Sequence, residues 1–236
     1  MSARPALIVF CREPLAGRSK TRLLSHLSPP DAAALADGFI VDTLAKAAKI
    51  RPGRLVIAGT SESSVTESVY FRSLGRRFDA ELLDQGRGSL GARMARALRF
   101  FAHERGALLV GTDLPSLPLA ALSRLYALVQ RHPLVLGPSL DGGYYAVGVR
   151  REVPPIFTGI RWGSARVFAD TVKRIKSAKL RLALGPVWHD VDRWPDLVLL
   201  CGYLRSLEAS ASRFRDHPCP ATARVLKQLG LLPRRR

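Results

Sequence analysis

Short apolar runs alternate along the chain with longer stretches in which apolar residues recur at helical spacing. Residues 5–11 ("PALIVFC") and 107–113 ("ALLVGTD") are continuous apolar runs of the length typical of buried strands. Residues 89–106 instead place Met94 and Phe101 on one face, which predicts a helix. Further strands are predicted at 54–60, 78–85 and 180–187, and a strand, a glycine turn and a second strand at 133–149. Further helices are predicted at 29–49, 62–74, 116–132, 164–178, 194–209 and 219–230.

This alternation predicts an α/β fold of Rossmann-like type, with a mostly parallel central sheet between two layers of helices. The length of 236 residues suits a single domain over residues 1–236, on which the C-terminal helices at about 194–230 would pack. Sheets of this kind bind ligands beside the carboxyl ends of their strands. Residues that directly follow a predicted strand are therefore the candidates for function.

The chain is strongly basic, with 37 Lys and Arg against 19 Asp and Glu and a net charge of +18. Such a charge attracts polyanions. However, the excess is scattered, the one dense cluster is the C-terminal "PRRR", and no zinc-finger or RNA-binding signature occurs. We expect no specific nucleic-acid partner, and a peripheral contact of the arginines with an anionic membrane stays open.

Cysteine content and apolar run lengths favour a cytoplasmic protein. The three cysteines, Cys11, Cys201 and Cys219, form neither a CxxC pair nor a metal-binding set, and reduced thiols are the expectation. The N-terminal apolar run is too short for a signal peptide. No apolar run reaches the roughly 18 residues that a transmembrane helix needs.

A basic loop, "GRSKTRL", follows the first predicted strand. Gly17 allows close backbone approach, Lys20 supplies a mobile charge, and the planar guanidinium of Arg22 can grip phosphate oxygens. A helix that started near Lys20 would add free N–H groups to an anion site. The alternative is a solvated basic loop, and the Walker spacing of a P-loop is absent from this stretch.

Carboxylates follow three later strands. Asp113 ends the apolar run 107–113, where it could hold a divalent cation or cap the next helix. Asp141 precedes two glycines in a predicted turn, where it could contact a ribose, an acceptor hydroxyl or a metal, or only close the turn. Asp190 and Asp192 are two residues apart, so in an extended segment they share one face and could complete a metal site with Asp113.

The glycine-rich stretch "QGRGSLGARM" lies between a predicted strand and a predicted helix. Gly86 and Gly91 would make a loop and helix start that could lie over a base or sugar, and Ser89 could cap the helix. By itself this composition is a weak indication of a nucleotide site.

Five motifs occur in order between Leu7 and Leu197: "FCREPLAGRSKTRL", "QGRGSLGARM", "GTDLPSL", "LGPSLDGGYYAVG" and "HDVDRWPDL". Together they resemble the bacterial DUF2064 group of the glycosyltransferase-A superfamily of nucleotide-diphospho-sugar transferases, whose members often occur beside radical-SAM genes. The resemblance implies a glycosyltransferase-A fold, a nucleotide-bound substrate and a divalent cation, Mg²⁺ or Mn²⁺. It also implies that Lys20 and Arg22 contact phosphates, that Asp113 binds the metal, and that Asp192, with Asp190, completes the metal site.

The opening loop also resembles the nucleotide-binding loop of molybdenum-cofactor and phospholactate guanylyltransferases. Four residues depart from the usual DUF2064 pattern and leave base and acceptor specificity open: Arg12, Ala16, Ser89 and Arg193.

The residues and the resemblance together predict a metal-dependent transferase that acts on a nucleotide sugar or a nucleoside triphosphate and on an unidentified small-molecule acceptor. Glycosyl transfer from a nucleotide sugar is the first hypothesis. Nucleotidyl transfer with release of pyrophosphate is the second, and a non-catalytic polyanion-binding protein is the third. The expected catalytic carboxylates are Asp113 and, on the acceptor side, Asp141.

Overall fold

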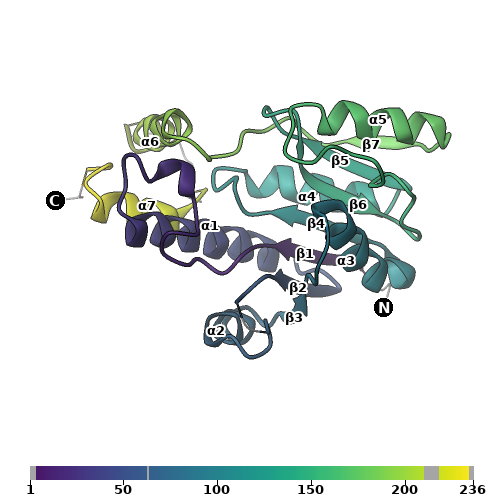
Figure 1. The fold of residues 1–236 in the computed structure, drawn as a ribbon, viewed down its shortest axis with the longest axis horizontal. Coiled ribbons are helices and arrows are strands. Elements are labelled where there is room, and N and C mark those ends of the chain that lie inside the picture. Colours follow the sequence, from purple (N-terminus) through teal and green to yellow (C-terminus); the bar gives the residue numbers. More distant parts are fainter. Residues whose placement is uncertain (1–3, 63, 210–217, 234–236) are drawn as a thin grey trace.

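A computed structural model of the chain describes residues 4–62, 64–209 and 218–233. Its described residues form a seven-stranded sheet in the order β3-β2-β1-β4-β6-β5-β7 (Figure 1). Of these strands, β6 alone runs antiparallel to its neighbours, so the prediction of a mostly parallel sheet is confirmed. The strands are β1 (Ala6–Phe10), β2 (Arg54–Gly59), β3 (Glu81–Asp84), β4 (Ala107–Gly111), β5 (Leu134–Pro138), β6 (Tyr144–Val149) and β7 (Leu182–Leu184).

Helices cover both faces of the sheet. The helices are α1 (Pro29–Lys49), α2 (Val69–Phe78), α3 (Leu90–Arg105), α4 (Leu119–Val129), α5 (Val167–Ser177), α6 (Trp194–Ala209) and α7 (Pro220–Gln228). Alternate residues of a strand point to opposite faces. Leu7 and Val9 of β1 therefore pack in a core with α1, α2 and α4, whereas Ala6 and Ile8 pack in a second core with α3 and α5. The result is the expected three-layer α/β/α arrangement.

The C-terminal helices are attached to the rest of the fold through α1. Leu35 and Phe39 of α1 share a third apolar core with α6 and α7. The buried carboxylate of Asp42 accepts hydrogen bonds from the backbone N–H groups of Ala221 (2.9 Å) and Thr222 (2.8 Å), and so caps the first turn of α7. Figure 1 shows α6 and α7 beside the loop that follows β1.

Most elements lie where the sequence predicts them, and α2 is the main exception. The helix expected at 62–74 begins at Val69, because Ser68 is its N-cap and accepts a hydrogen bond from the N–H of Phe71 (3.3 Å). It then continues to Phe78 and ends at Asp79, which adopts the left-handed conformation, so β3 starts later than expected. The serines and threonines before Val69 favour turns over helix.

Two further expectations concern the chain as a whole. Cys11, Cys201 and Cys219 are buried and are not joined in a disulfide. In the part of the chain that the structure describes, no helix combines the length and apolar character needed to cross a membrane. The basic cluster of Arg234, Arg235 and Arg236 lies outside the described residues.

Candidate functional site

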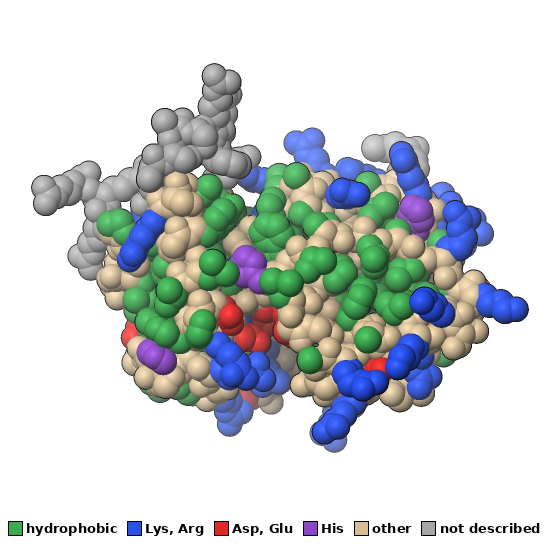
Figure 2. All heavy atoms as spheres, turned by 90° about the horizontal axis from the view of Figure 1, so that it is seen from above, with side chains coloured by type: hydrophobic (Ala, Val, Ile, Leu, Met, Phe, Trp, Pro, Cys, Tyr) green, Lys and Arg blue, Asp and Glu red, His purple; other side chains and the backbone are tan. Residues whose placement is uncertain are grey.

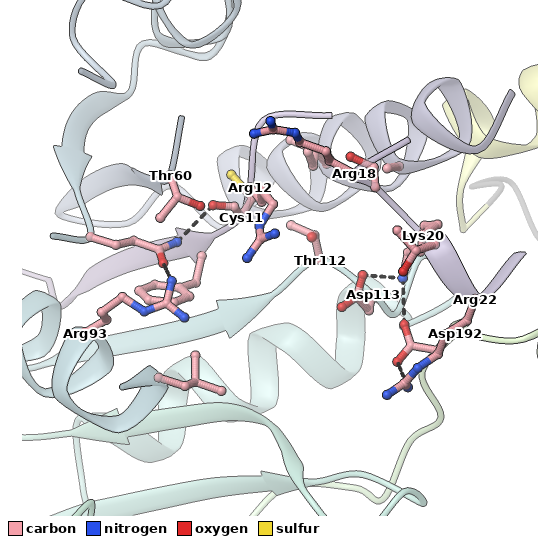
Figure 3. Close-up of a pocket in the computed structure, with 17 residues that line it drawn as sticks. Cys11, Arg12, Arg18, Lys20, Arg22, Thr60, Arg93, Thr112, Asp113 and Asp192 are labelled. Carbon is pink, nitrogen blue, oxygen red and sulfur yellow. Dashed lines mark hydrogen bonds and ion pairs between the residues drawn. The ribbon is translucent and has the colours of Figure 1, made fainter. Parts of the chain in front are cut away.

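A cleft of about 390 Å³ opens at the carboxyl ends of β1 and β4 (Figure 3). It is lined by residues of the loop after β1, the residues that follow β4, the first turn of α3 and the segment before α6. The charged residues among those that line it are Arg12, Arg18, Lys20, Arg22, Arg93, Asp113 and Asp192. Cationic side chains outnumber carboxylates in this set, so the cleft suits an anionic ligand.

The Lys20 side chain lies at the centre of the charged end of the cleft. Its ammonium group donates to the carboxylate of Asp113, to the carbonyl oxygen of Val191 (2.9 Å) and to Oδ1 of Asp192 (3.0 Å). Burial alone would lower the pKa of Lys20, but the two carboxylates outweigh it and raise this pKa above the ordinary value. Lys20 is therefore a buried, permanently charged group at physiological pH.

The backbone around Lys20 differs from the expected helix start. Thr21–Leu23 form only one short 3-10 turn, preceded by Lys20 in the left-handed conformation (φ 47°), and α1 begins at Pro29. The proposed anion site from helix N–H groups near Lys20 is therefore wrong. Arg22 of this turn extends to Oδ2 of Asp192 (3.3 Å) and remains largely exposed.

The carboxylate of Asp113 faces the cleft and does not cap the following helix. The N-cap of α4 is Pro118, which has no side-chain capping bond, while Asp113 pairs with Lys20. The carbonyl oxygen of Asp113 accepts a hydrogen bond from the N–H of Val191 (2.8 Å), which joins the end of β4 to the segment before α6. Of the two alternatives for Asp113, the geometry favours a role in the site.

Lys46 of α1 fixes the loop that follows Asp113. Its buried ammonium group donates to the carbonyl oxygens of Pro115 (2.6 Å) and Leu117 (3.0 Å). Burial lowers the pKa of Lys46 to about 8, although Cys219 and Asp42 oppose this shift. The sequence analysis did not identify this residue, since a lysine within a helical pattern carries no indication of a distant partner.

Asp192 is positioned by the start of α6. Oδ2 of Asp196 accepts hydrogen bonds from the backbone N–H groups of Asp192 (3.0 Å) and Arg193 (2.8 Å). Val191 is fully buried, so the segment is anchored on both sides of the carboxylate. Asp192 thus reaches the cleft from a fixed backbone.

Arg93 and Arg12 approach the other end of the cleft (Figure 3). The buried Gln85 donates from Nε2 to the carbonyl oxygens of Cys11 and Ala58 (both 2.9 Å) and accepts from Nη1 of Arg93 (2.8 Å). Nε of Arg93 is buried with no hydrogen-bond partner among the described residues. Burial, and then the charge of Arg12, lower the pKa of Arg93.

These two guanidinium groups therefore form a place for an anion or a carbonyl-rich group. Within the described part of the chain, neither of them forms an ion pair with a carboxylate. Sequence reasoning missed Arg93, although it stands in the quoted glycine-rich motif, at the first turn of α3.

A second hollow of about 270 Å³ adjoins the cleft. The residues that line both are Phe10, Leu90, Thr112, Asp113 and Asp192. The second hollow adds Tyr144 and the carboxylates of Asp141 and Asp190. Figure 2 shows acidic side chains gathered in a hollow of this face, with Lys and Arg side chains beside them.

Asp141 and Asp190 both line the second hollow, together with Asp113. Because β5 runs parallel to β4, the turn from β5 to β6 lies at the sheet edge that carries Asp113. Oδ1 of Asp141 accepts the N–H of Gly143 (2.8 Å), so Asp141 closes the turn and also lines the second hollow. Oδ2 of Asp190 accepts from Oγ of Ser139 (2.5 Å). Burial, with the charge of Asp141 and then Asp113, raises the pKa of Asp190 to about 7 against the effect of the Ser139 hydrogen bond.

The three glycines expected at a nucleotide do not line the cleft. Gly17 and Gly86 adopt positive φ angles (77° and 70°) in the two loops that flank it. Gly91 packs against the ring of Trp162, where an added Cβ would lie 2.8 Å from Cε2. They shape the loops that carry Lys20 and Arg93, and their contact with a nucleotide stays a prediction.

The donors at the charged end of the cleft suit a hard divalent cation. Among the described residues, no group of three or more His, Cys, Asp or Glu side chains is placed to hold a metal ion. Asp113, Asp192 and the Val191 carbonyl nevertheless already converge on one cation, the ammonium of Lys20. Mg²⁺ characteristically takes one or two protein carboxylates together with phosphate oxygens of a substrate. The donor set therefore fits such an ion.

Comparison with solved structures places this fold among nucleotide-using transferases. A protein of Desulfovibrio desulfuricans G20, provisionally assigned as a nucleotide-diphospho-sugar transferase, superimposes with a TM-score of 0.80 at 28% identity, over 97% of this chain and 96% of that one. A CMP:2-keto-3-deoxy-manno-octonic acid synthetase, solved with CTP, gives a TM-score of 0.53 at 12% identity, over 86% of this chain and 99% of that one. A nucleotidyl transferase from Methanothermobacter gives 0.54 at 12% identity, over 86% and 99%.

The similarities to the synthetase and to the nucleotidyl transferase concern the fold alone. The similarity to the Desulfovibrio protein extends over nearly the whole chain at higher identity. The prediction of the fold is thereby confirmed, and the prediction of a transferase is confirmed by the first of these structures. Residues 41–164, more than half of the chain, match the model of DUF2064, described as an uncharacterized protein conserved in bacteria, and the chain belongs to this family. No curated protein matches the chain.

Proposed function

We propose that this protein is a metal-dependent glycosyltransferase that takes a nucleotide sugar as donor. The observation that carries the proposal is the meeting of two hollows at Asp113. The charged residues that line the first are mainly cationic, and those that line the second are all carboxylates. A donor with a negatively charged diphosphate suits the first hollow. A polyhydroxylated acceptor suits the second, because hydroxyl groups donate hydrogen bonds to carboxylates.

On the donor side, the diphosphate lies at the charged end of the cleft, within reach of Lys20 and Arg22. Their charges offset the negative charge that develops on the departing nucleoside diphosphate. Asp113 and Asp192, with the Val191 carbonyl, would hold Mg²⁺ or Mn²⁺, which supplies further charge stabilisation for the same leaving group. The base or ribose extends toward Gln85, Arg12 and Arg93.

On the acceptor side, a hydroxyl oxygen of the acceptor attacks the anomeric carbon of the donor sugar. The new carbon–oxygen bond forms as the bond from that carbon to the diphosphate oxygen breaks, and the nucleoside diphosphate leaves. Asp141 is the carboxylate proposed to receive the hydroxyl proton. Asp190, hydrogen-bonded to Ser139, shares this hollow and contributes to binding the acceptor.

Nucleotidyl transfer is the second candidate, and the position of Lys20 favours it. The lysine comes from the loop directly after β1 and lies beside the strand-end carboxylate Asp113, where it could contact the triphosphate of a nucleotide. In this reaction a phosphorylated acceptor attacks the α-phosphorus atom and pyrophosphate leaves. The two candidates differ in the bond that breaks and in the released product.

A thermal-shift screen of nucleoside triphosphates and nucleotide sugars, with and without Mg²⁺ or Mn²⁺, tests the proposal, since a ligand of the folded state raises the melting temperature. A metal-dependent shift with one nucleotide sugar, followed by release of a nucleoside diphosphate in the presence of acceptors, supports glycosyl transfer. A shift confined to one triphosphate, with pyrophosphate release, supports the second candidate.

Asp113→Asn is the matched variant for this screen. It should lose the metal-dependent shift but unfold within about 1 kcal/mol of the wild type, because the Asp113 side chain is half exposed and Lys20 keeps two other partners. Equal, salt-sensitive shifts with every polyanion, unaffected by metal or by this substitution, would instead support a basic binding protein without catalysis.

A further inference from the structure

The proposed cation site already contains a positive charge that belongs to the chain. The Lys20 ammonium contacts both carboxylates and the Val191 carbonyl, and only 7% of the Lys20 side chain is exposed. The carboxylates are far more open, with 51% of the Asp113 side chain and 37% of the Asp192 side chain exposed. An ion arriving from the cleft can therefore reach the carboxylates, but it meets a cation already bound to them.

The lysine is held there by more than its ion pairs. Nζ lies 5.0 Å from the centre of the Phe39 ring, a cation–π contact on the side of α1. The backbone of Lys20 is in the left-handed conformation at this point (φ 47°). Carboxylates, a carbonyl and an aromatic face together form a complete set of partners for an ammonium group.

We propose that the Lys20 ammonium is the resident cation of the Asp113–Asp192 site, and that it yields this site to a divalent ion only when a phosphate group arrives with the ion and accepts the ammonium in turn. The inference rests on the proposed function and specifies the form in which the nucleotide binds. The protein would bind the metal complex of a nucleotide, and would bind either the metal or the phosphate alone much more weakly.

The reason is the balance of charge in the cleft. A divalent ion that enters alone must displace Lys20 and leaves an ammonium group beside a second cation. A phosphate offers the displaced ammonium a new partner within the same cleft, whose charged lining residues are mainly cationic and suit an anion. The two ligands thus assist each other, and couplings of this type typically change affinities about 5- to 150-fold.

Arg22 provides a matched control. It also pairs with Asp192, at 3.3 Å, but its side chain is 62% exposed and can move into solvent. Arg22→Met and Lys20→Met each remove one positive charge near the same carboxylate. Only the lysine substitution removes the competing cation.

The test measures Mn²⁺ binding by the electron paramagnetic resonance signal of free Mn²⁺, without any nucleotide. Lys20→Met should bind Mn²⁺ at least about fivefold more tightly than the wild type, and Arg22→Met less than about twofold more tightly. Inorganic phosphate should strengthen Mn²⁺ binding to the wild type at least about fivefold. The Mn²⁺ affinity of Lys20→Met should be nearly the same with and without phosphate. Mn²⁺–phosphate complexes are measured without protein and subtracted. Lys20→Gln, which retains a donor for Val191, is the second variant should Lys20→Met not fold.

Unchanged or weaker Mn²⁺ binding in both lysine variants would overturn the inference, as would a gain no larger than that of Arg22→Met. The proposed metal site would survive that result if the wild type binds Mn²⁺ and Asp113→Asn does not. Failure of every protein to bind Mn²⁺, with or without phosphate, would overturn the metal site and the inference together.

Discussion

Lys46 should make a contribution to the stability of the protein that rises with pH. Its ammonium is buried against the carbonyl oxygens of Pro115 and Leu117, and burial lowers its pKa from 10.5 to about 8. Between these two pH values the unfolded chain holds a proton that the folded chain has released. The contribution of Lys46 to stability therefore increases with pH through this window, whereas the buried thiols of Cys11 and Cys219, whose pKa values are raised to about 12, contribute in the opposite direction.

The size of the effect follows from the two pKa values. A pKa difference of one unit corresponds to about 1.4 kcal/mol, so the shift of Lys46 corresponds to about 3 kcal/mol. This penalty is present in full below pH 8 and is relieved as the pH approaches 10.5. Lys46→Met removes the titrating group, so the unfolding free energy of the wild type minus that of the variant should rise by about 3 kcal/mol from neutral pH to pH 10.5.

Urea denaturation of both proteins at the two pH values, followed by tryptophan fluorescence, measures this difference. Thiols and phenols that do not interact with Lys46 are common to both chains and cancel. Cys219 does interact with Lys46, but burial raises the pKa of Cys219 to about 12, above this pH range. Lys49→Met is the control, because Lys49 is exposed on the same helix and does not bind the loop carbonyls of Pro115 and Leu117. A wild-type-minus-Lys46→Met difference that stays constant or falls with pH would refute the reasoning.

Three further outcomes are expected. Arg93→Met should weaken binding of the nucleotide found in the thermal screen by roughly 10- to 100-fold, since a hydrogen bond to a charged group contributes about 1.5–3 kcal/mol. Calorimetry measures this affinity, and it should change little in the control Arg99→Met, on the exposed side of the same helix. Equal effects of the two substitutions would show that Arg93 is not part of the site. Gly91→Ala should lower the free energy of unfolding by roughly 1–3 kcal/mol, because the added Cβ meets the ring of Trp162. Gly202→Ala should not lower it, because the space around that Cβ is open. Equal melting temperatures of the two variants would contradict this prediction. Asp113→Asn should keep its stability while losing metal-dependent nucleotide binding, and a large drop in its unfolding free energy would instead assign Asp113 a structural role.

Local signals predicted much of the fold. Apolar runs located the strands, and the interpretation of Ser89 as a cap of α3 is confirmed by its bond to the N–H of Ala92 (3.3 Å). The rule that functional residues follow strands brought Asp113 and Lys20 into consideration before any contact was known. Each of these inferences depends on neighbours within a few residues in the sequence.

The contacts that define the site are not local. Lys20 and Asp113 are 93 residues apart, and Lys20 and Asp192 are 172 apart, so no spacing rule predicts that all three meet. Arg93 is one of many arginines, and only its bond to Gln85 distinguishes it. The sequence analysis predicted separately that Lys20 binds phosphate and that Asp113 and Asp192 bind a metal ion. In the fold, these three side chains form one cluster.

The hydrogen bond from the N–H of Val191 to the carbonyl oxygen of Asp113 joins two segments that are synthesised at different times. Synthesis proceeds from the N-terminus, so the last strand, β7 (Leu182–Leu184), is made before Asp192. A nascent chain that ends before the segment leading to α6 has the strands of the sheet but lacks Asp192, and Lys20 then has only Asp113 as a carboxylate partner. The cluster of Lys20, Asp113 and Asp192 is therefore completed only after residue 192 has been synthesised, later than all seven strands of the sheet.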